Sequence, residues 1–296
     1  MDLRETAFWA RRLFPGAVRI GVRQAWLPGR RRRRSRPGIP VKVAEFSLYD
    51  ASSDPDAIPD VADGSAGAFD GAPAAAEIDG PRREIAAFTV NFGRVDLGLR
   101  APDGGDVRVE MFLVAYPDSV GVGDGADAAA ADDSVVARAV AGAAALIADD
   151  PEAARPTPGS VIPDAVRVGL DAGQDSEPNA GQGSTVGQEA AEAESGFAAS
   201  GSTTPHLLCV VPYVWPDGVP TITEEPGKIS LHEDEGTAGF PDAVTGGARL
   251  TTVTQLVPIT DAEYAHANER GVDSLMQMLA AADADLRDLR RASVVA

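Results

Sequence analysis

The sequence is poor in the residues that crosslink or anchor small proteins. One cysteine, Cys209, occurs among 296 residues, so no intramolecular disulfide can form, and its apolar neighbours predict a buried thiol. Aromatic residues make up 5% of the chain, so a core has to be built mainly on valine, leucine and alanine. No run of about 18 apolar residues is present, which argues against a membrane-spanning helix. Together these absences predict a cytoplasmic protein.

Motifs for catalysis, metal binding and cofactor binding are also missing. No histidine has a partner at the spacing of a zinc-binding helix, and one cysteine cannot form a CxxC pair. The chain contains neither a P-loop nor a GxSxG turn. His206 and Cys209 lie three residues apart in a predicted strand, so their side chains point to opposite faces. The sequence therefore predicts no catalytic residue, no metal ligand and no cofactor.

Charge is divided unevenly along the chain. The formal net charge is −19, but residues 1–42 carry +10, so residues 43–296 carry −29. A body this acidic repels nucleic acid and anionic membranes and attracts a basic protein. The usage of a GC-rich genome explains the same acidity without a partner, because arginine and aspartate abound and only two lysines occur.

The first 40 residues form a basic arm that differs from the rest. Arginines interrupt each apolar run, so the segment is not a secretory signal. We predict that residues 1–40 are disordered, with no strand or capped helix. One alternative is an arm that lies on anionic lipid or nucleic acid, anchored by Trp9, Phe14 and Trp26. Others are a gene start placed too far upstream, or a tail that folds against the acidic body.

Three internal segments are too rich in small and polar residues to form a core: 50–81, 118–133 and 170–204. We predict that they are flexible insertions in a single domain over residues 41–296. Ser134 is a candidate cap for a helix that runs to about Ile147, because apolar residues follow it at helical spacing. The remaining periodicity predicts strands at Val41–Tyr49, Ile85–Phe92, Val95–Leu99, Val107–Tyr116 (the longest), Val166–Leu170, Leu207–Tyr213, Ile229–Leu231 and Leu250–Val257. The expected fold class is α/β (α+β), a mixed β-sheet packed by helices.

The C-terminal part of the chain gives the clearest local signals. Pro258 cannot donate to a β ladder and is expected to end the strand before it. Thr260 and Glu263 have the spacing of a capping box, which begins a helix. Gly271 is placed to end that helix in the left-handed conformation. A second helix is predicted from an apolar stripe of Leu275, Met278, Leu279 and Ala282.

These signals, in this order, resemble the end of the Suppressor of fused domain. That family has a strand running into a Leu-Val-Pro-Ile-Thr segment, matched here by Leu256–Thr260, then an acidic residue, a glycine and a leucine-rich helix. A strand leading to a Pro-aromatic segment matches His206–Gly218, and a strand with an internal glutamate matches Asp106–Tyr116. The resemblance spans roughly residues 84–293. It implies a Suppressor of fused-like fold and a non-catalytic protein-binding module.

The resemblance also implies a kind of partner. Eukaryotic members clasp an extended peptide of a transcription factor, and bacterial members are often taken to be immunity proteins that neutralise a toxin. Because the sequence ends soon after the Pro-Ile-Thr element, we expect it to lack the second domain that completes the eukaryotic clasp. An acidic body suits a basic toxin domain. The alternatives are an enzyme with an unrecognised site and an accessory protein of another role.

The resemblance points to a set of family-motif or candidate protein-binding residues. Tyr213 and Trp215 form either an exposed aromatic ledge or a plug of the sheet end. Glu110 is expected to pair with an arginine (Arg108, Arg290 or Arg291) or else to face a groove. Glu263 is first of all a helix cap. The complete set is Glu110, Pro212, Tyr213, Trp215, Pro258, Ile259, Thr260, Glu263 and Gly271.

Overall fold

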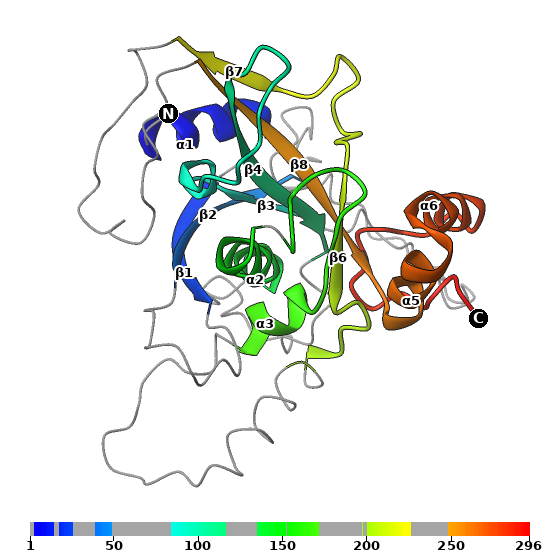
Figure 1. The fold of residues 1–296 in the computed structure, drawn as a ribbon. Coiled ribbons are helices and arrows are strands. Elements are labelled where there is room, and N and C mark those ends of the chain that lie inside the picture. The colour runs from blue at the N-terminus through cyan, green and yellow to red at the C-terminus, as the bar shows by residue number, and fades with distance from the viewer. Residues whose placement is uncertain are drawn as a thin grey trace, which may run out of the picture.

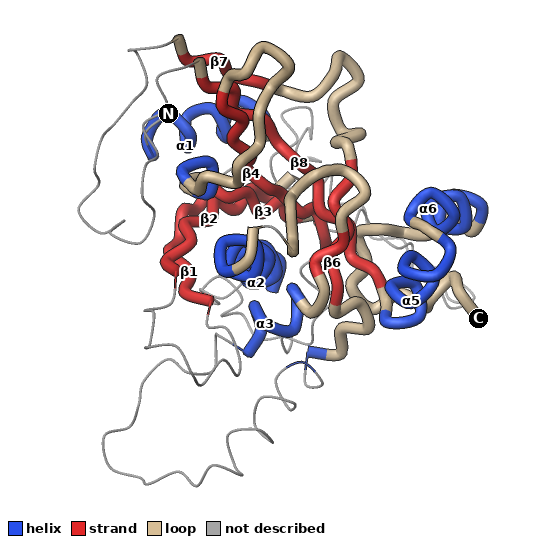
Figure 2. Tube along the Cα trace, viewed as in Figure 1, coloured by secondary structure: helices blue, strands red, loops and turns tan. Residues whose placement is uncertain are grey.

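The computed structural model describes residues 3–14, 18–25, 39–48, 84–116, 135–151, 153–171, 197, 200–225 and 248–296. Its strands are β1 (Val18–Ala25), β2 (Ile39–Ser47), β3 (Ile85–Thr89), β4 (Asp106–Ala115), β5 (Val161–Ile162), β6 (His206–Val210), β7 (Thr221–Glu224) and β8 (Arg249–Ile259). They form one sheet in the order β1-β2-β3-β4-β8-β6-β5, with β7 beside β8. β4 and β8 are parallel, and the other pairs are antiparallel. The predicted mixed sheet is confirmed (Figures 1 and 2).

Helices cover both faces of this sheet. They are α1 (Leu3–Leu13), the short 3-10 helix η2 (Phe92–Arg94), α2 (Val135–Asp149), α3 (Ala165–Asp171), α5 (Asp261–Arg270) and α6 (Val272–Ala281). Side chains alternate along each strand, so Met111 packs with the α2 cluster while Phe112 packs with the α1 cluster. The pair α5–α6 packs on β6 and the end of β8, through Leu208 and Val257. No helix in the described ranges is long and apolar enough to cross a membrane.

The helix α2 is buried on most sides, because the sheet curls around it and α3 closes over it (Figure 1). Two glycines allow α2 and α3 to approach closely. A Cβ on Gly142 would lie 2.1 Å from the carbonyl oxygen of Ala165, and one on Gly169 would lie 2.0 Å from that of Arg138. The predicted strand Val166–Leu170 is therefore wrong. This apolar run is a helix. A short apolar run fits either a buried strand or a buried helix, and packing against α2 favours the helix here.

Other strands also differ from the predictions in their position or length. Val95–Leu99 is not a strand: η2 and the loop after it run beside β4, and an isolated β-bridge joins Arg100 to Asp106. The strand β7 was not predicted, and the predicted strand Ile229–Leu231 lies outside the described residues. The longest strand is β8, with 11 residues, whereas β4 has 10.

Pro258 does not end β8, contrary to the prediction. The strand continues to Ile259, and Pro258 stands opposite Leu207 of β6. The parallel pairing with β4 stops at Leu256, so the missing N–H of Pro258 leaves no bond with β4 unmade. Its carbonyl instead accepts a hydrogen bond from Arg291 at 2.9 Å.

The prediction for residues 1–40 is wrong where the structure describes them. β1 pairs along its length with β2, and α1 packs on the sheet. Trp9 and Phe14 are 8% and 4% exposed, so they are core residues and not surface anchors. Phe14 contacts the rings of Phe46, Phe88, Phe112 and Trp215. Arg4, Arg11 and Arg12 lie on the exposed side of α1, and the sequence pattern alone did not distinguish this side from the buried one. Trp26 and the three proposed insertions, apart from a few residues at their edges, lie outside the described residues.

Candidate functional site

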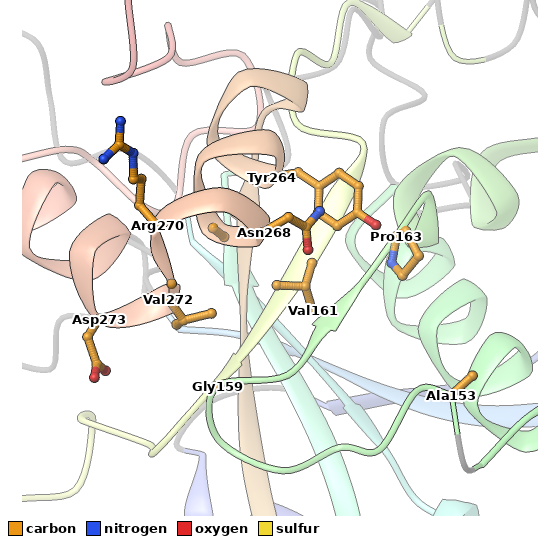
Figure 3. Close-up of a pocket in the computed structure, with 11 residues that line it drawn as sticks. Ala153, Gly159, Val161, Pro163, Tyr264, Asn268, Arg270, Val272 and Asp273 are labelled. Carbon is orange, nitrogen blue, oxygen red and sulfur yellow. The ribbon is translucent and has the colours of Figure 1, made fainter.

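A groove of about 690 Å³ lies where β5 faces the α5–α6 pair (Figure 3). One wall is the segment 153–163, which includes β5, and the other is the surface of α5 and the turn into α6. The lining residues are Ala153, Gly159, Val161, Pro163, Tyr264, Ala267, Asn268, Arg270, Gly271, Val272 and Asp273. Segments that are more than a hundred positions apart in the sequence therefore build one surface.

The first wall ends in an edge strand. β5 pairs with β6 on one side, through Val161 opposite Leu208, and within the described residues no strand pairs with its other side. Gly159 stands just before it, with a φ of 90° and open space where a Cβ would be. An edge strand offers backbone donors and acceptors that another extended chain can pair with. The wall is thus a backbone surface rather than a cluster of reactive side chains.

The second wall carries polar side chains that are free to bind. Tyr264, Ala267 and Asn268 recur at helical spacing, so they share one side of α5, and Figure 3 shows Tyr264 extending toward Pro163. Asn268 and Asp273 are exposed, and within the described part of the chain neither side chain has a hydrogen-bond or ion-pair partner. The groove therefore combines an open backbone edge with unpaired polar groups.

A capping box fixes the start of the α5 wall. The hydroxyl of Thr260 accepts from the N–H of Glu263 at 3.3 Å, and the Glu263 carboxylate accepts from the N–H of Thr260 at 2.9 Å. The predicted capping box is confirmed. Gly271 ends the helix with φ 90° and ψ 154°, so its φ is positive as expected, although its ψ is extended instead of left-handed helical.

Glu263 also forms a buried ion pair with the C-terminal tail. Arg291 donates to its two oxygens at 2.6 and 2.7 Å, and the N–H of Val294 donates at 3.0 Å. Burial by itself would raise the pKa of this carboxyl, but Arg291, Val294 and Thr260 outweigh burial and hold the pKa below its usual value. The carboxylate is therefore ionised, and it ties α5 to the tail.

His206 and Cys209, on β6, are poorly suited to catalysis. The Nδ1 of His206 accepts from the N–H of Asp164 at 2.9 Å, so Nε2 carries the proton and donates to Asp261 at 2.9 Å. Both ring nitrogens are occupied. Burial raises the pKa of the Cys209 thiol to about 12, and its side chain packs in the α2 cluster on the other face of β6. The described residues contain no group of three potential metal ligands.

The predicted aromatic ledge divides into an exposed and a packed part. Tyr213 is 57% exposed in the loop between β6 and β7, next to the exposed Val211 and Val214. Trp215 instead packs against Phe112, with ring centroids 5.1 Å apart, so it belongs to the core on the α1 side. Pro212 is also buried. A single exposed aromatic ring remains at this place, on a loop away from the groove lining.

Glu110 lies inside the molecule, 1% exposed, and is not at a groove. The expected arginine partner is wrong for the described structure: Glu110 accepts from the hydroxyl of Thr89, from the N–H of Gly93 at 2.9 Å and from the N–H of Phe92 at 3.2 Å. Arg108 pairs with Asp106 instead. Burial raises the pKa of Glu110 to about 8, and the three donors offset part of that rise.

The structure brings together only part of the predicted set. Pro258, Thr260 and Glu263 meet around Arg291, with Ile259 buried beside them, and Gly271 lines the groove. Sequence reasoning missed Val161, Tyr264 and Asn268. A two-residue edge strand leaves no periodic signal, and Asn268 has no local feature that separates it from a solvated helix position.

The fold and part of the sequence can be compared with known proteins. The described residues form a mixed α/β sheet domain with a groove at one sheet edge. Residues 175–292, less than half of the chain, match the model of the Suppressor of fused protein family, which confirms the resemblance over this part of the sequence. The segment includes β6, β8, α5 and α6, but not β4, for which the resemblance had also been inferred.

Two further comparisons add little. A crystal structure described as a suppressor of fused homologue from Neisseria gonorrhoeae FA 1090 aligns over 99% of this chain and 95% of its own, with 14% identity and a TM-score of 0.40. At that score it supports no argument about function. A search of curated proteins finds no match.

Proposed function

We propose that the chain is a non-catalytic protein-binding module, and that the groove between β5 and α5–α6 receives an extended segment of a partner protein. The observation that supports this most is that β5, an edge strand within the described residues, lines the groove together with polar side chains of α5 and α6. Strand addition at a sheet edge gives affinity through the backbone, and the facing wall gives selectivity. On this proposal residues 41–296 form one domain, to which α1 and β1 also belong.

The proposed partner segment is basic. Asp164 and Asp261 stand beside the groove with side chains 51% and 76% exposed. Glu269 and Asp273 are exposed on α5 and α6, while Arg270 is the one basic residue in the groove lining. Residues 43–296 carry −29, which favours the approach of a cationic protein over long distances. A basic toxin domain has this chemistry, so we propose the role of an immunity protein that neutralises such a toxin.

The enzyme alternative has less support. A general base needs an accessible lone pair that can take a proton from the substrate. Both nitrogens of His206 already form hydrogen bonds. A nucleophilic thiol needs a lowered pKa, whereas that of Cys209 is raised to about 12. The ionised carboxylate of Glu263 is taken up by Arg291 and backbone amides. His206 and Glu263 instead connect α5 to β6 and to the C-terminal tail.

Selection of random twelve-residue segments on the full chain would test the groove without knowledge of the natural partner. We expect the selected segments to carry net positive charge. Binding, followed by fluorescence anisotropy, should weaken at least tenfold in Asn268→Arg, because the new side chain fills the groove and repels cations. The matched control is Gln277→Arg on α6, which adds the same charge at an exposed position outside the groove. It should bind nearly as the wild type does.

Two outcomes would refute the proposal. Selected segments without a basic preference would remove the argument from charge. Equal weakening by Asn268→Arg and Gln277→Arg would show that net charge alone governs binding and that the groove is not the site. Melting curves of both variants would confirm that each is folded, since neither position is buried.

A further inference from the structure

The helix α1 has two opposite sides of different chemistry. Its inner side packs on the sheet through Trp9 and Ala10, which are 8% and 0% exposed. At about 100° per residue, Arg4, Phe8, Arg11 and Arg12 fall on the outer side. All four are exposed. The helix is therefore held rigidly by its inner side and presents the other to its surroundings.

The outer side combines an exposed aromatic ring with unpaired cations. Phe8 is 65% exposed, and on the helical wheel it falls between Arg11 and Arg4 on one flank and Arg12 on the other. None of the three guanidinium groups has a hydrogen-bond or ion-pair partner within the residues that the structure describes. An exposed phenylalanine ring adds little to the stability of the fold, because the packing contacts of α1 are made by its inner side.

We propose that the outer side of α1 docks on an anionic lipid surface. A helix that lies in a membrane interface inserts apolar rings among the acyl chains and places arginines at the phosphate level, and Phe8 with its flanking arginines has that arrangement. A nucleic acid backbone would need the arginines but would give the central aromatic ring nothing apolar to enter. The ring therefore favours lipid over nucleic acid.

The charge of the rest of the molecule sets the orientation and strength of this contact. Residues 43–296 carry −29, so an anionic membrane repels the body, and a contact through the cationic outer side of α1 offsets that repulsion. Repulsion is screened over about 10 Å at 0.1 M salt, while contacts of Phe8 and the arginines act at short range. Binding should be reversible, dependent on anionic lipid and sensitive to salt.

Vesicle flotation of the full chain tests the proposal. Phosphatidylcholine vesicles that contain phosphatidylserine should carry several-fold more protein than pure phosphatidylcholine vesicles, and raising the salt should remove the difference. Phe8→Ala should lower the bound fraction several-fold without a change in melting temperature, since the ring is exposed. Arg11→Gln should lower it too, and Arg11→Lys should restore it. Arg155→Gln removes the same charge from an exposed position far along the chain and should have little effect.

The contrary results are clear. Equal flotation with both lipids, or wild-type flotation of Phe8→Ala, would overturn the proposal. Binding of a duplex DNA or RNA that falls in Arg11→Gln but not in Phe8→Ala, together with no flotation, would assign the surface to nucleic acid instead.

Discussion

Two buried carboxylates in this molecule are stabilised in opposite ways. Glu263 meets a cation, Arg291, and two backbone amides, so its pKa lies below the usual value. Glu110 meets only neutral donors, and its pKa rises to about 8. The first is ionised at neutral pH, and the second is mainly protonated. When Glu110 is protonated, the Thr89 hydroxyl can accept a hydrogen bond from the carboxylic acid and donate its own to the carbonyl of Met111, 3.5 Å away.

The two carboxylates also differ in location: Glu263 lies on a helix that lines the groove, and Glu110 lies inside the sheet. The Glu263 pair joins α5, β8 and the tail, and residues of the same helix line the groove. The Glu110 cluster joins β4 to η2 and the end of β3, and none of its residues lines the groove. Both residues were candidates for protein binding. We infer that both are structural, and that only Glu263 supports the proposed binding surface.

The largest expected effect is a dependence of stability on pH that comes from Glu110. Its folded pKa of about 8 exceeds the unfolded value of 4.5, so its contribution is complete below pH 4.5 and is lost as the pH rises through 8. The wild type should lose roughly 1 kcal/mol per pH unit in that window relative to Glu110→Gln. Urea unfolding at several pH values measures this. Parallel pH profiles of the two proteins would mean that Glu110 is ionised throughout.

Removal of the cation beside Glu263 should be the most destabilising single change at neutral pH. Arg291→Met leaves a buried carboxylate without its partner, which costs about 3–5 kcal/mol. The neighbouring Arg290→Met is the control, because Arg290 is exposed and makes one long bond to Ser200. Urea unfolding of both variants gives the comparison. A similar small loss for both would show that the Glu263 pair contributes little.

Truncation in the apolar support of α6 should rank next. Leu279 is 2% exposed and packs with Leu275 on β6 and β8, as the sequence predicted. Leu279→Ala should cost about 2–5 kcal/mol through lost burial and a residual cavity. Gln277→Ala, on the exposed side of α6, should change stability little. An unchanged melting temperature for Leu279→Ala would contradict the packing.

The cap itself should have the smallest effect. Thr260→Ala removes the hydroxyl that accepts from the N–H of Glu263 but leaves the ion pair with Arg291 in place. We expect a loss of about 0.5–2 kcal/mol. A loss as large as that of Arg291→Met would mean that the cap and the ion pair form one cooperative unit, and the double variant would then show strong non-additivity.

Local signals predicted the C-terminal element well. A capping box and an apolar stripe depend on residues three or four apart, so the sequence shows them directly: Thr260 with Glu263, and Leu275 with Leu279. The class of the fold followed from the same periodicities. The family match rests on this part of the chain as well.

The features that were missed depend on distant contacts. Arg291 is 28 positions from Glu263, and the bonds of Glu110 come from residues 17 to 21 positions away. Residues 1–40 were predicted to be disordered, because the burial of α1 depends on aromatic residues from β2, β3 and β4 that the local sequence does not show. The groove joins β5 to α5, and only the tertiary fold places Val161 near Asn268.

The most direct test of the groove is a map of where a bound segment lies. A selected basic segment with a photoreactive group would be crosslinked to the full chain, and the adducts located by mass spectrometry. The account predicts adducts on residues 159–163 and 264–273, which form the two walls. Adducts confined to residues 211–215, around the exposed Tyr213, would contradict it and place the binding surface on the loop between β6 and β7.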